Sequence, residues 1–144
     1  MGMFTTLNIT GSALTAERFR MNIIAQNLAN ISTTSTENGE PYRRKQVVFQ
    51  EKQMDFASAL ETETYKLTNG GVRAVKVVES QADFVPVYDP DHPDADENGY
   101  VYYPNVDRTE EQIDLMAATR AYEANLTALN VIKQTMAKAL EIGK

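Results

Sequence analysis

Apolar residues near the end of the chain recur with a period of seven. The repeat comprises Leu115, Ala118, Tyr122, Leu129, Ile132 and Met136. This spacing predicts a helix over residues 105–144 that packs along another helix. Asp107, followed three residues later by Glu110, is similar to a capping box and predicts where the helix begins. A helix without Gly or Pro from 106 to 142 is about 55 Å long at 1.5 Å per residue, so we expect it to need a partner.

A second apolar repeat occupies residues 5–31 and predicts another long helix. Its members are Leu7, Leu14, Met21, Ile24 and Leu28. The small residues at positions 11–13 would let a neighbouring helix approach closely. Taken singly, either stripe is typical of an ordinary core helix. Two such stripes in one short chain favour a coiled coil between the two ends, parallel or antiparallel, or packing against other subunits.

The region between these helices is richer in strand and turn residues. We expect short strands at residues 42–49, 72–78, 84–88 and 100–103, with neither face of the second clearly apolar and Pro86 restricting the third to an edge. The predicted fold is therefore mainly α with a small β part. We divide it into an N-terminal helix at residues 1–31, a connecting loop and small β subdomain at 32–104, and a C-terminal helix at 105–144.

The net charge of −6 is concentrated in one loop. Six of the 20 acidic residues fall between positions 83 and 98, where there is no Lys or Arg, and the other acidic residues equal the 14 basic ones in number. The short basic run at 43–45 does not make a nucleic-acid stripe, so we expect no nucleic-acid partner. No stretch reaches the ~20 apolar residues of a membrane span, and we expect neither a spanning segment nor a cleaved secretory signal.

Candidate chemistry in this acidic loop is limited. Asp94, Asp96, Asn98 and Gly99 match the first half of a calcium loop, but Asn105 stands where a bidentate Glu is needed. A soluble calcium-binding regulator using residues 94–105 is therefore the alternative function. The only histidine, His92, lies in the same loop, and the chain has no cysteine for a nucleophile, a disulfide or a thiolate metal site. We expect no enzyme activity, no cofactor and no metal.

Polar residues on the predicted helices permit two interpretations. Asn27 and Asn30 lie near the end of the first helix, and Asn125 follows Tyr122 in the second. Such residues are either solvated or buried in hydrogen bonds that fix the helix register, as one polar seam residue does in coiled coils. The pattern alone leaves both readings open.

Several motifs resemble the axial proteins of the bacterial flagellum. NIIAQNLAN at 22–30 is similar to their N-terminal signature, and RAYEAN at 120–125 to their C-terminal one. GEPYRRKQVVF at 39–49, VYDPDHPDAD at 87–96 and GYVYYPNV at 99–106 resemble the proximal rod proteins of the basal body, the FlgC type. The resemblance covers residues 4–50 and 70–144.

The resemblance implies a structural subunit of the flagellar rod, which crosses the periplasm and transmits torque for motility. Its terminal helices would form a coiled-coil layer that stacks with copies of itself and with other rod proteins. The flagellar type III export apparatus would be a further partner. The candidate assembly interface comprises Leu7, Leu14, Met21, Ile24, Asn27, Leu28, Asn30, Leu115, Tyr122, Asn125, Leu129, Ile132 and Met136.

Overall fold

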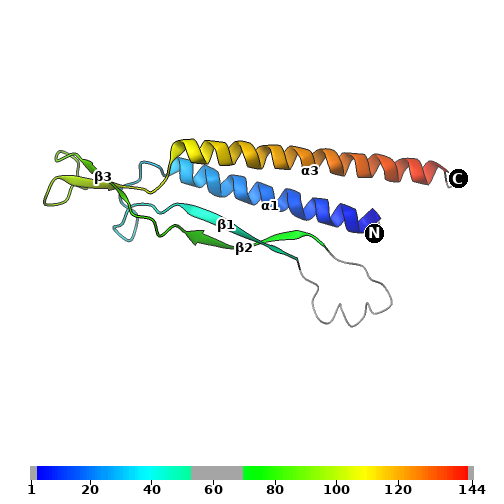
Figure 1. Ribbon diagram of the computed structural model, residues 1–144, viewed down its shortest axis with the longest axis horizontal. Helices are drawn as coiled ribbons and strands as arrows, with labels where there is room; N and C mark the ends of the chain where they lie inside the picture. Colours follow the sequence, from blue (N-terminus) through cyan, green and yellow to red (C-terminus); the bar gives the residue numbers. More distant parts are fainter. Residues whose placement is uncertain (1–2, 53–69, 143–144) are drawn as a thin grey trace, which may run out of the picture. The chain divides into compact units, whose positions relative to one another are not determined.

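The computed structural model describes residues 3–52 and 70–142, which form two long helices and four short strands (Figure 1). In chain order these are α1 (Met3–Ala29), β1 (Lys45–Glu51), β2 (Val72–Glu79), β3 (Val85–Tyr88), β4 (Tyr100–Tyr103) and α3 (Arg108–Ile142). This confirms the predicted class, mainly α with a small β part.

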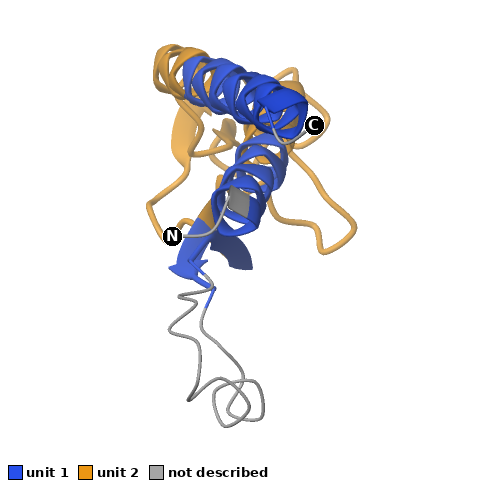
Figure 2. Cartoon of the chain, turned by 90° about the vertical axis from the view of Figure 1, so that its right-hand side faces the viewer, with its two compact units in different colours: residues 1–19, 48–76, 118–144 blue, residues 20–47, 77–117 orange. Residues whose placement is uncertain are grey.

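The chain divides into two compact units (Figure 2). Unit 1 contains residues 1–19, 48–76 and 118–144, and unit 2 contains residues 20–47 and 77–117. Each unit therefore combines a stretch of α1 with a stretch of α3. In unit 2 these stretches are antiparallel, because Arg20 pairs with Asp114 while Asn27, further along α1, contacts Glu111, which lies earlier in α3. The parallel arrangement of the two helices is excluded there.

Side-chain hydrogen bonds mark where α1 stops and α3 starts. The Asn30 side-chain nitrogen donates to the carbonyl of Gln26 at 2.9 Å just beyond Ala29, where α1 ends two residues before the predicted end. Asp107 Oδ1 accepts the backbone N–H groups of Thr109 at 2.7 Å and Glu110 at 3.2 Å. These are two of the N–H groups that a helix start leaves without partners, and they confirm Asp107 as the N-cap.

The strands form two separate two-stranded sheets, β1–β2 and β3–β4. The β3–β4 pair is antiparallel, with Val85 opposite Tyr103 and Tyr88 opposite Tyr100. Beyond the ends of β1–β2, Ser80 N–H donates to the carbonyl of Arg44, and Lys52 N–H donates to the carbonyl of Gly71. All four predicted strands are present, although β1 starts three residues later than expected.

The start of β2 lies against α1 within unit 1. Gly71 has a φ of 145°, and a Cβ added there would lie 2.7 Å from Ser12 Oγ. That hydroxyl accepts the N–H of Val72 at 3.1 Å and donates to the carbonyl of Ile9 at 2.7 Å. At Ser12 the segment that approaches these small residues is therefore the start of a strand, and not the helix that the sequence pattern predicts.

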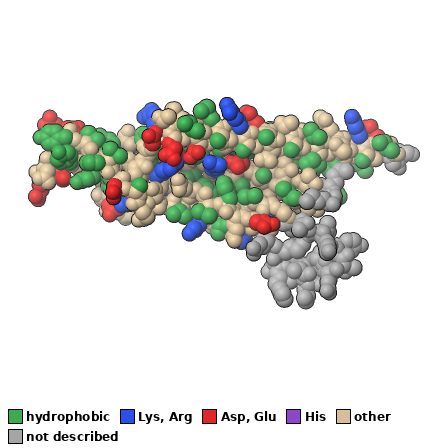
Figure 3. Space-filling model, viewed as in Figure 1, with side chains coloured by type: hydrophobic (Ala, Val, Ile, Leu, Met, Phe, Trp, Pro, Cys, Tyr) green, Lys and Arg blue, Asp and Glu red, His purple; other side chains and the backbone are tan. Residues whose placement is uncertain are grey.

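Few apolar side chains are buried among the described residues. They are Ile23, Ile24, Tyr42 and Val101 in unit 2 and Ala16 and Ala118 in unit 1. Many large apolar side chains stay exposed, and Figure 3 shows hydrophobic side chains gathered over the β3–β4 hairpin. A subunit that buries so little and exposes so much apolar surface is suited to contacts with partners.

Candidate functional site

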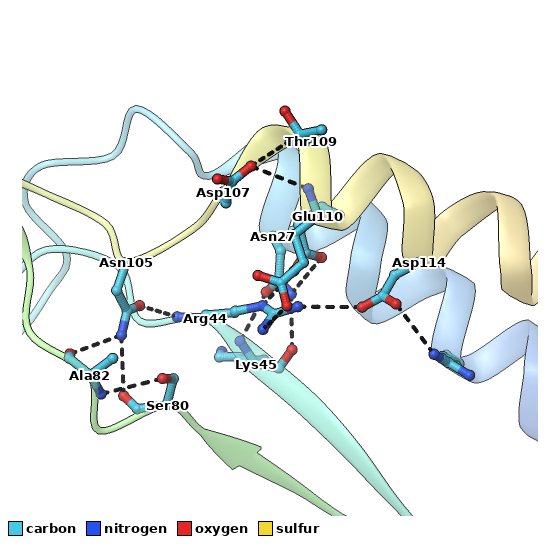
Figure 4. A network of polar contacts seen from close by, with 12 residues as sticks. Asn27, Arg44, Lys45, Ser80, Ala82, Asn105, Asp107, Thr109, Glu110 and Asp114 are labelled. Carbon is cyan, nitrogen blue, oxygen red and sulfur yellow. Dashed lines mark hydrogen bonds and ion pairs between the residues drawn. The ribbon is translucent and has the colours of Figure 1, made fainter.

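Asn27 is the centre of a polar network in unit 2 (Figure 4). Its side chain is only 1% exposed. The amide nitrogen donates to the carbonyl of Lys45 at 2.9 Å and to Glu111 Oε2 at 3.0 Å. The amide oxygen accepts the Tyr42 hydroxyl at 2.9 Å and the Lys45 N–H at 3.0 Å. Both amide protons and both lone pairs of the amide oxygen are hydrogen-bonded, so burial leaves no polar group of this side chain without a partner. Of the two readings of Asn27, the buried one is correct.

Glu111 joins the start of α3 to this amide and to Arg44. Its side chain is 1% exposed, one carboxylate oxygen accepting from Asn27 and the other from Arg44 Nε. The Arg44 guanidinium also faces Glu110 at 3.2 Å and Asp114 at 3.3 Å. Asp114 in turn lies 3.6 Å from Arg20 of α1. A buried carboxylate is tolerated here because it is paired and hydrogen-bonded.

Asn105 extends the same network towards the strands. Its side-chain oxygen accepts the N–H of Arg44 at 2.8 Å, and its nitrogen donates to the carbonyl of Ala82 at 2.9 Å. The segment that precedes β1 is therefore held by α1, by α3 and by the turn that follows β2. The cluster therefore connects four parts of unit 2: α1, the segment before β1, the turn after β2 and the start of α3 (Figure 4).

Burial and charge shift two pKa values in this network. Burial raises the pKa of the Tyr42 phenol above its ordinary value, and the negative charges of Glu111 and Glu79 raise it further. Burial alone would lower the pKa of Arg44, but its hydrogen bond to Glu111 and the charges of Glu111, Glu110 and Asp114 raise it. Tyr42 is thus held as a neutral donor and Arg44 as a cation.

The sequence pattern does not predict the roles of Arg44 and Glu111. The basic run at 43–45 is too short for a nucleic-acid stripe, and the acidic start of α3 predicts only a capping box. A signal was present, since Glu110, Glu111 and Asp114 supply the negative charges that a short basic run could pair with. Nothing in the sequence, however, says which of them is buried.

The predicted seam residues face inwards to different degrees. On α1, Ile24 and Asn27 are buried, whereas the other predicted positions are half-buried: Leu7, Leu14, Met21, Leu28 and Asn30. On α3, Ala118 is buried, Ala139, which continues the predicted repeat, is exposed, and the other predicted positions are half-buried: Leu115, Tyr122, Asn125, Leu129, Ile132 and Met136. Asn125 donates to the carbonyl of Ala121 within its own helix at 2.9 Å. Of the seam residues, Asn27 alone is shown in the network of Figure 4.

A second apolar stripe on α3 escaped the heptad analysis. Ile113, Met116, Val131 and Ile142 are exposed, between 55% and 86%, and their helical spacing puts them on the side away from the seam. Small and polar residues interrupt the stripe, which is why a strict seven-residue repeat misses it. This outer face is the part of α3 available to another molecule.

The acidic loop uses its carboxylates internally. Asp94 Oδ2 accepts the Thr34 hydroxyl at 2.7 Å, and Asp96 Oδ1 accepts the N–H groups of Asn98 at 2.9 Å and Tyr100 at 2.8 Å. The His92 ring accepts the N–H of Asp94 at 3.1 Å. Over residues 3–52 and 70–142, no group of three or more acidic, His or Cys side chains is placed to hold a metal ion. Nothing in the loop geometry favours the calcium-binding alternative.

Comparison with known proteins decides the family. Residues 7–35 match the family of flagella basal body rod proteins, and residues 97–142 match the C-terminal family of flagellar basal body rod FlgEFG proteins. The flagellar basal-body rod protein FlgC of Bacillus subtilis is 49% identical over 150 aligned residues, which cover 100% of both chains. The chain belongs to the FlgC family of flagellar basal-body rod proteins.

Other FlgC proteins agree over the whole length. That of Salmonella typhimurium is 44% identical, with 100% of both chains covered, and that of Borreliella burgdorferi is 39% identical, with 99% of this chain and 98% of its own covered. As an FlgC-type protein, the chain is a structural subunit of the flagellar basal-body rod. Neither long helix, as far as the structure describes it, has a stretch apolar enough to cross a membrane.

Proposed function

We propose that this FlgC-type subunit assembles with copies of itself and with other rod proteins into a helical rod that transmits torque across the periplasm. The observation that supports this most directly is the presence of two apolar faces on α3. The inner seam is half-buried, and the outer stripe that includes Ile113, Met116 and Val131 is exposed. A helix with apolar residues on both sides serves as the middle layer of a larger helical assembly.

The proposal assigns the two faces different partners. The seam residues named above hold α1 and α3 as a pair, and the pair is the surface that neighbours recognise. The N-terminal segment 1–31 and the C-terminal segment 105–144 then form the rod core, and residues 32–104 connect them. Stiff helices packed through many interdigitated side chains resist twisting, because close-packed interiors have low compressibility. Such a role requires no catalysis.

The type III export apparatus of the flagellum is the partner proposed for delivery. Passage through a narrow channel requires an unfolded chain, and a subunit with a small core has a low free energy of unfolding. The absence of cysteine fits as well, because no disulfide has to be opened before export.

The seam provides the decisive experiment. Leu129→Asp places a charge on a half-buried seam position, where it is poorly solvated. We expect loss of rod assembly and of swimming when the variant replaces the native chain. The matched control is Asn130→Asp, which adds the same charge at the neighbouring exposed position and should leave both intact. Normal basal bodies built from Leu129→Asp would refute the proposal.

A further inference from the structure

The β3–β4 hairpin has an outer face made of aromatic and proline side chains. Opposite residues in an antiparallel pair share a face, and the register pairs Pro86 with Tyr102 and Tyr88 with Tyr100. All four side chains are exposed, Tyr88 by 65%. The rings of Tyr88 and Tyr100 meet edge to face, with centroids 5.3 Å apart. Tyrosine is enriched in protein interfaces because it combines a large apolar area with a polar tip.

The other side of the hairpin is covered only in part. There Val101 is fully buried, whereas Val85 and Val87 are 53% and 42% exposed. Arg43 lies over the ring of Phe84, just before β3, at 4.3 Å from its centroid. At the loop end, Gly99 has a φ of 80°, and a Cβ added there would lie 3.0 Å from the Tyr88 ring. The outer tyrosines are therefore ordered before any partner arrives, which lowers the entropic cost of binding.

The charge around this face is of one sign. The residues at positions 83–98, which include β3 and the loop to β4, contain Asp83, Asp89, Asp91, Asp94, Asp96 and Glu97 and no Lys or Arg. Figure 3 shows acidic side chains around the hydrophobic ones at the hairpin. A matching surface must be apolar and carry positive charge, because like charges brought together would weaken binding.

The chain itself carries such a surface on β2. Every residue of β2 except Ala74 is exposed. Arg73, Val75 and Val77 alternate onto one face of the strand, where the two valines are 49% and 39% exposed, and Val72 and Lys76 lie on the other face. Among the described strands β2 pairs only with β1, so it is an edge strand with an exposed face that is apolar and carries Arg73. Aliphatic side chains beside a cation complement aromatic side chains flanked by carboxylates.

We propose that the tyrosine face of the β3–β4 hairpin in one copy of the chain docks on the face of β2 formed by Arg73, Val75 and Val77 in a second copy. The inference rests on the proposed self-assembly and adds the contact that links one copy to the next. Two different surfaces meet, so each docked copy still offers a free hairpin or a free β2. Contacts of this kind build a ring where the rotation between copies closes and a helical array where it does not, and the second outcome fits a rod. Pro86 has no N–H group, which disfavours strand addition along β3 and leaves the face as the contact.

Cysteine cross-linking tests the contact directly, since the chain has no cysteine of its own. Two differently tagged full-length chains, one with Tyr102→Cys and one with Val75→Cys, are made in the same cells. Basal bodies are then purified and treated with a short bifunctional maleimide. We expect a dimer that carries both tags, and no dimer when either variant is the only chain present. Basal bodies that assemble without the mixed dimer, or that give a dimer from Tyr102→Cys alone, would overturn the proposal.

Charge reversal tests the same contact without cysteine. Asp91→Lys with Glu97→Lys, or Arg73→Glu, should each reduce the number of assembled basal bodies at least tenfold. Combining all three changes in one chain should restore most of them, because attraction returns with the signs exchanged. Glu37→Lys, at an exposed position outside the hairpin, is the control and should have no effect.

The outcomes separate this contact from the proposed function. Loss with rescue supports the docking, whereas loss without rescue assigns these charges to another partner and overturns it. If the charge variants assemble normally while Leu129→Asp does not, the docking proposal fails and the proposed helical assembly stands.

Discussion

The first turns of α3 contain buried residues, whereas its last turns are exposed. Near its start, Asp107 caps the helix, Glu111 is buried on Asn27 and Arg44, and Ala118 is fully buried. Beyond residue 125, none of the positions described is buried, and the exposed residues include Leu126, Val131, Leu140 and Ile142. The first turns of α3 therefore combine buried polar contacts with the exposed side chains of Ile113 and Met116, whereas its later turns contain no buried position among those described.

The comparison separates what specifies the subunit from what is available to partners. A buried ion pair contributes little net stability, because desolvating both charges offsets their attraction, but it tolerates few alternative arrangements. An apolar stripe contributes free energy with almost any apolar neighbour. We infer that the polar network defines how α1, the segment before β1 and α3 fit together, and that the distal turns of α3 gain their stability from assembly.

Removing Glu111 should show the largest effect on the isolated subunit. Glu111→Ala removes the buried carboxylate that accepts hydrogen bonds from Arg44 and from the Asn27 amide. Loss of one partner in a buried pair lowers the free energy of unfolding by about 3–5 kcal/mol. Urea denaturation of the purified subunit measures the free energy of unfolding. Glu110→Ala is the control, because that carboxylate is 59% exposed and its pair with Arg44 should contribute about 1 kcal/mol or less. Equal losses in the two variants would contradict the contrast.

The N-cap gives a smaller effect with a defined pH dependence. Backbone N–H groups of Glu110 and Thr109 lower the pKa of Asp107. Since the folded pKa lies below the unfolded value of about 3.9, this contribution is present above that pH and is lost as the pH falls through the folded pKa. Asp107→Ala should therefore unfold more readily than the native chain at neutral pH, by less than Glu111→Ala.

In acid, the native chain and the Asp107→Ala variant should have the same free energy of unfolding. Thermal unfolding followed by circular dichroism from pH 7 down to pH 2 would reveal it. An Asp107→Ala defect that stays constant across this range would mean that the carboxylate charge is not what stabilises the start of α3.

The outer stripe should show almost no effect on the subunit and a large one on the rod. Val131 is 55% exposed, so Val131→Ser should change the free energy of unfolding by no more than about 0.5 kcal/mol. Assembly, counted as basal bodies per cell, should fall sharply if partners cover this face. Val131→Ile preserves the apolar surface and should assemble normally. Normal assembly with Val131→Ser would show that the stripe at this position is left uncovered in the rod.

The helices and strands could be predicted where the sequence has a regular pattern of apolar and turn residues. The seven-residue repeats located both helices within a few residues, and turn residues separated the four strands, because each of these signals is local in sequence. The position of Asn27 was not predictable in the same way. Its burial depends on Lys45, Tyr42 and Glu111, which lie 15 to 84 positions away, and only the tertiary structure brings them together.

The outer surfaces were missed for a related reason. Ile113 and Val131 are apolar residues outside the heptad repeat, and an analysis based on one stripe treats such residues as exceptions. The exposed tyrosines of β4 were recognised only as strand formers, since alternation cannot tell which face of a hairpin is covered. Both surfaces became visible once the exposure of each residue was known.

The four hydrogen bonds of Asn27 also have a mechanical consequence. Two helices that contact each other through an apolar seam can shift by one helical turn, about 5.4 Å, and still make similar apolar contacts. The seam by itself therefore resists a steady force along the helix axis poorly. Of the four bonds, only the one to Glu111 joins α1 to α3, whereas the other three join α1 to Tyr42 and Lys45. A shift of α3 would separate the Asn27 amide from the buried Glu111 carboxylate and leave both short of a partner. In unit 2, sliding of α1 along α3 is therefore opposed by a specific polar contact in addition to the apolar seam.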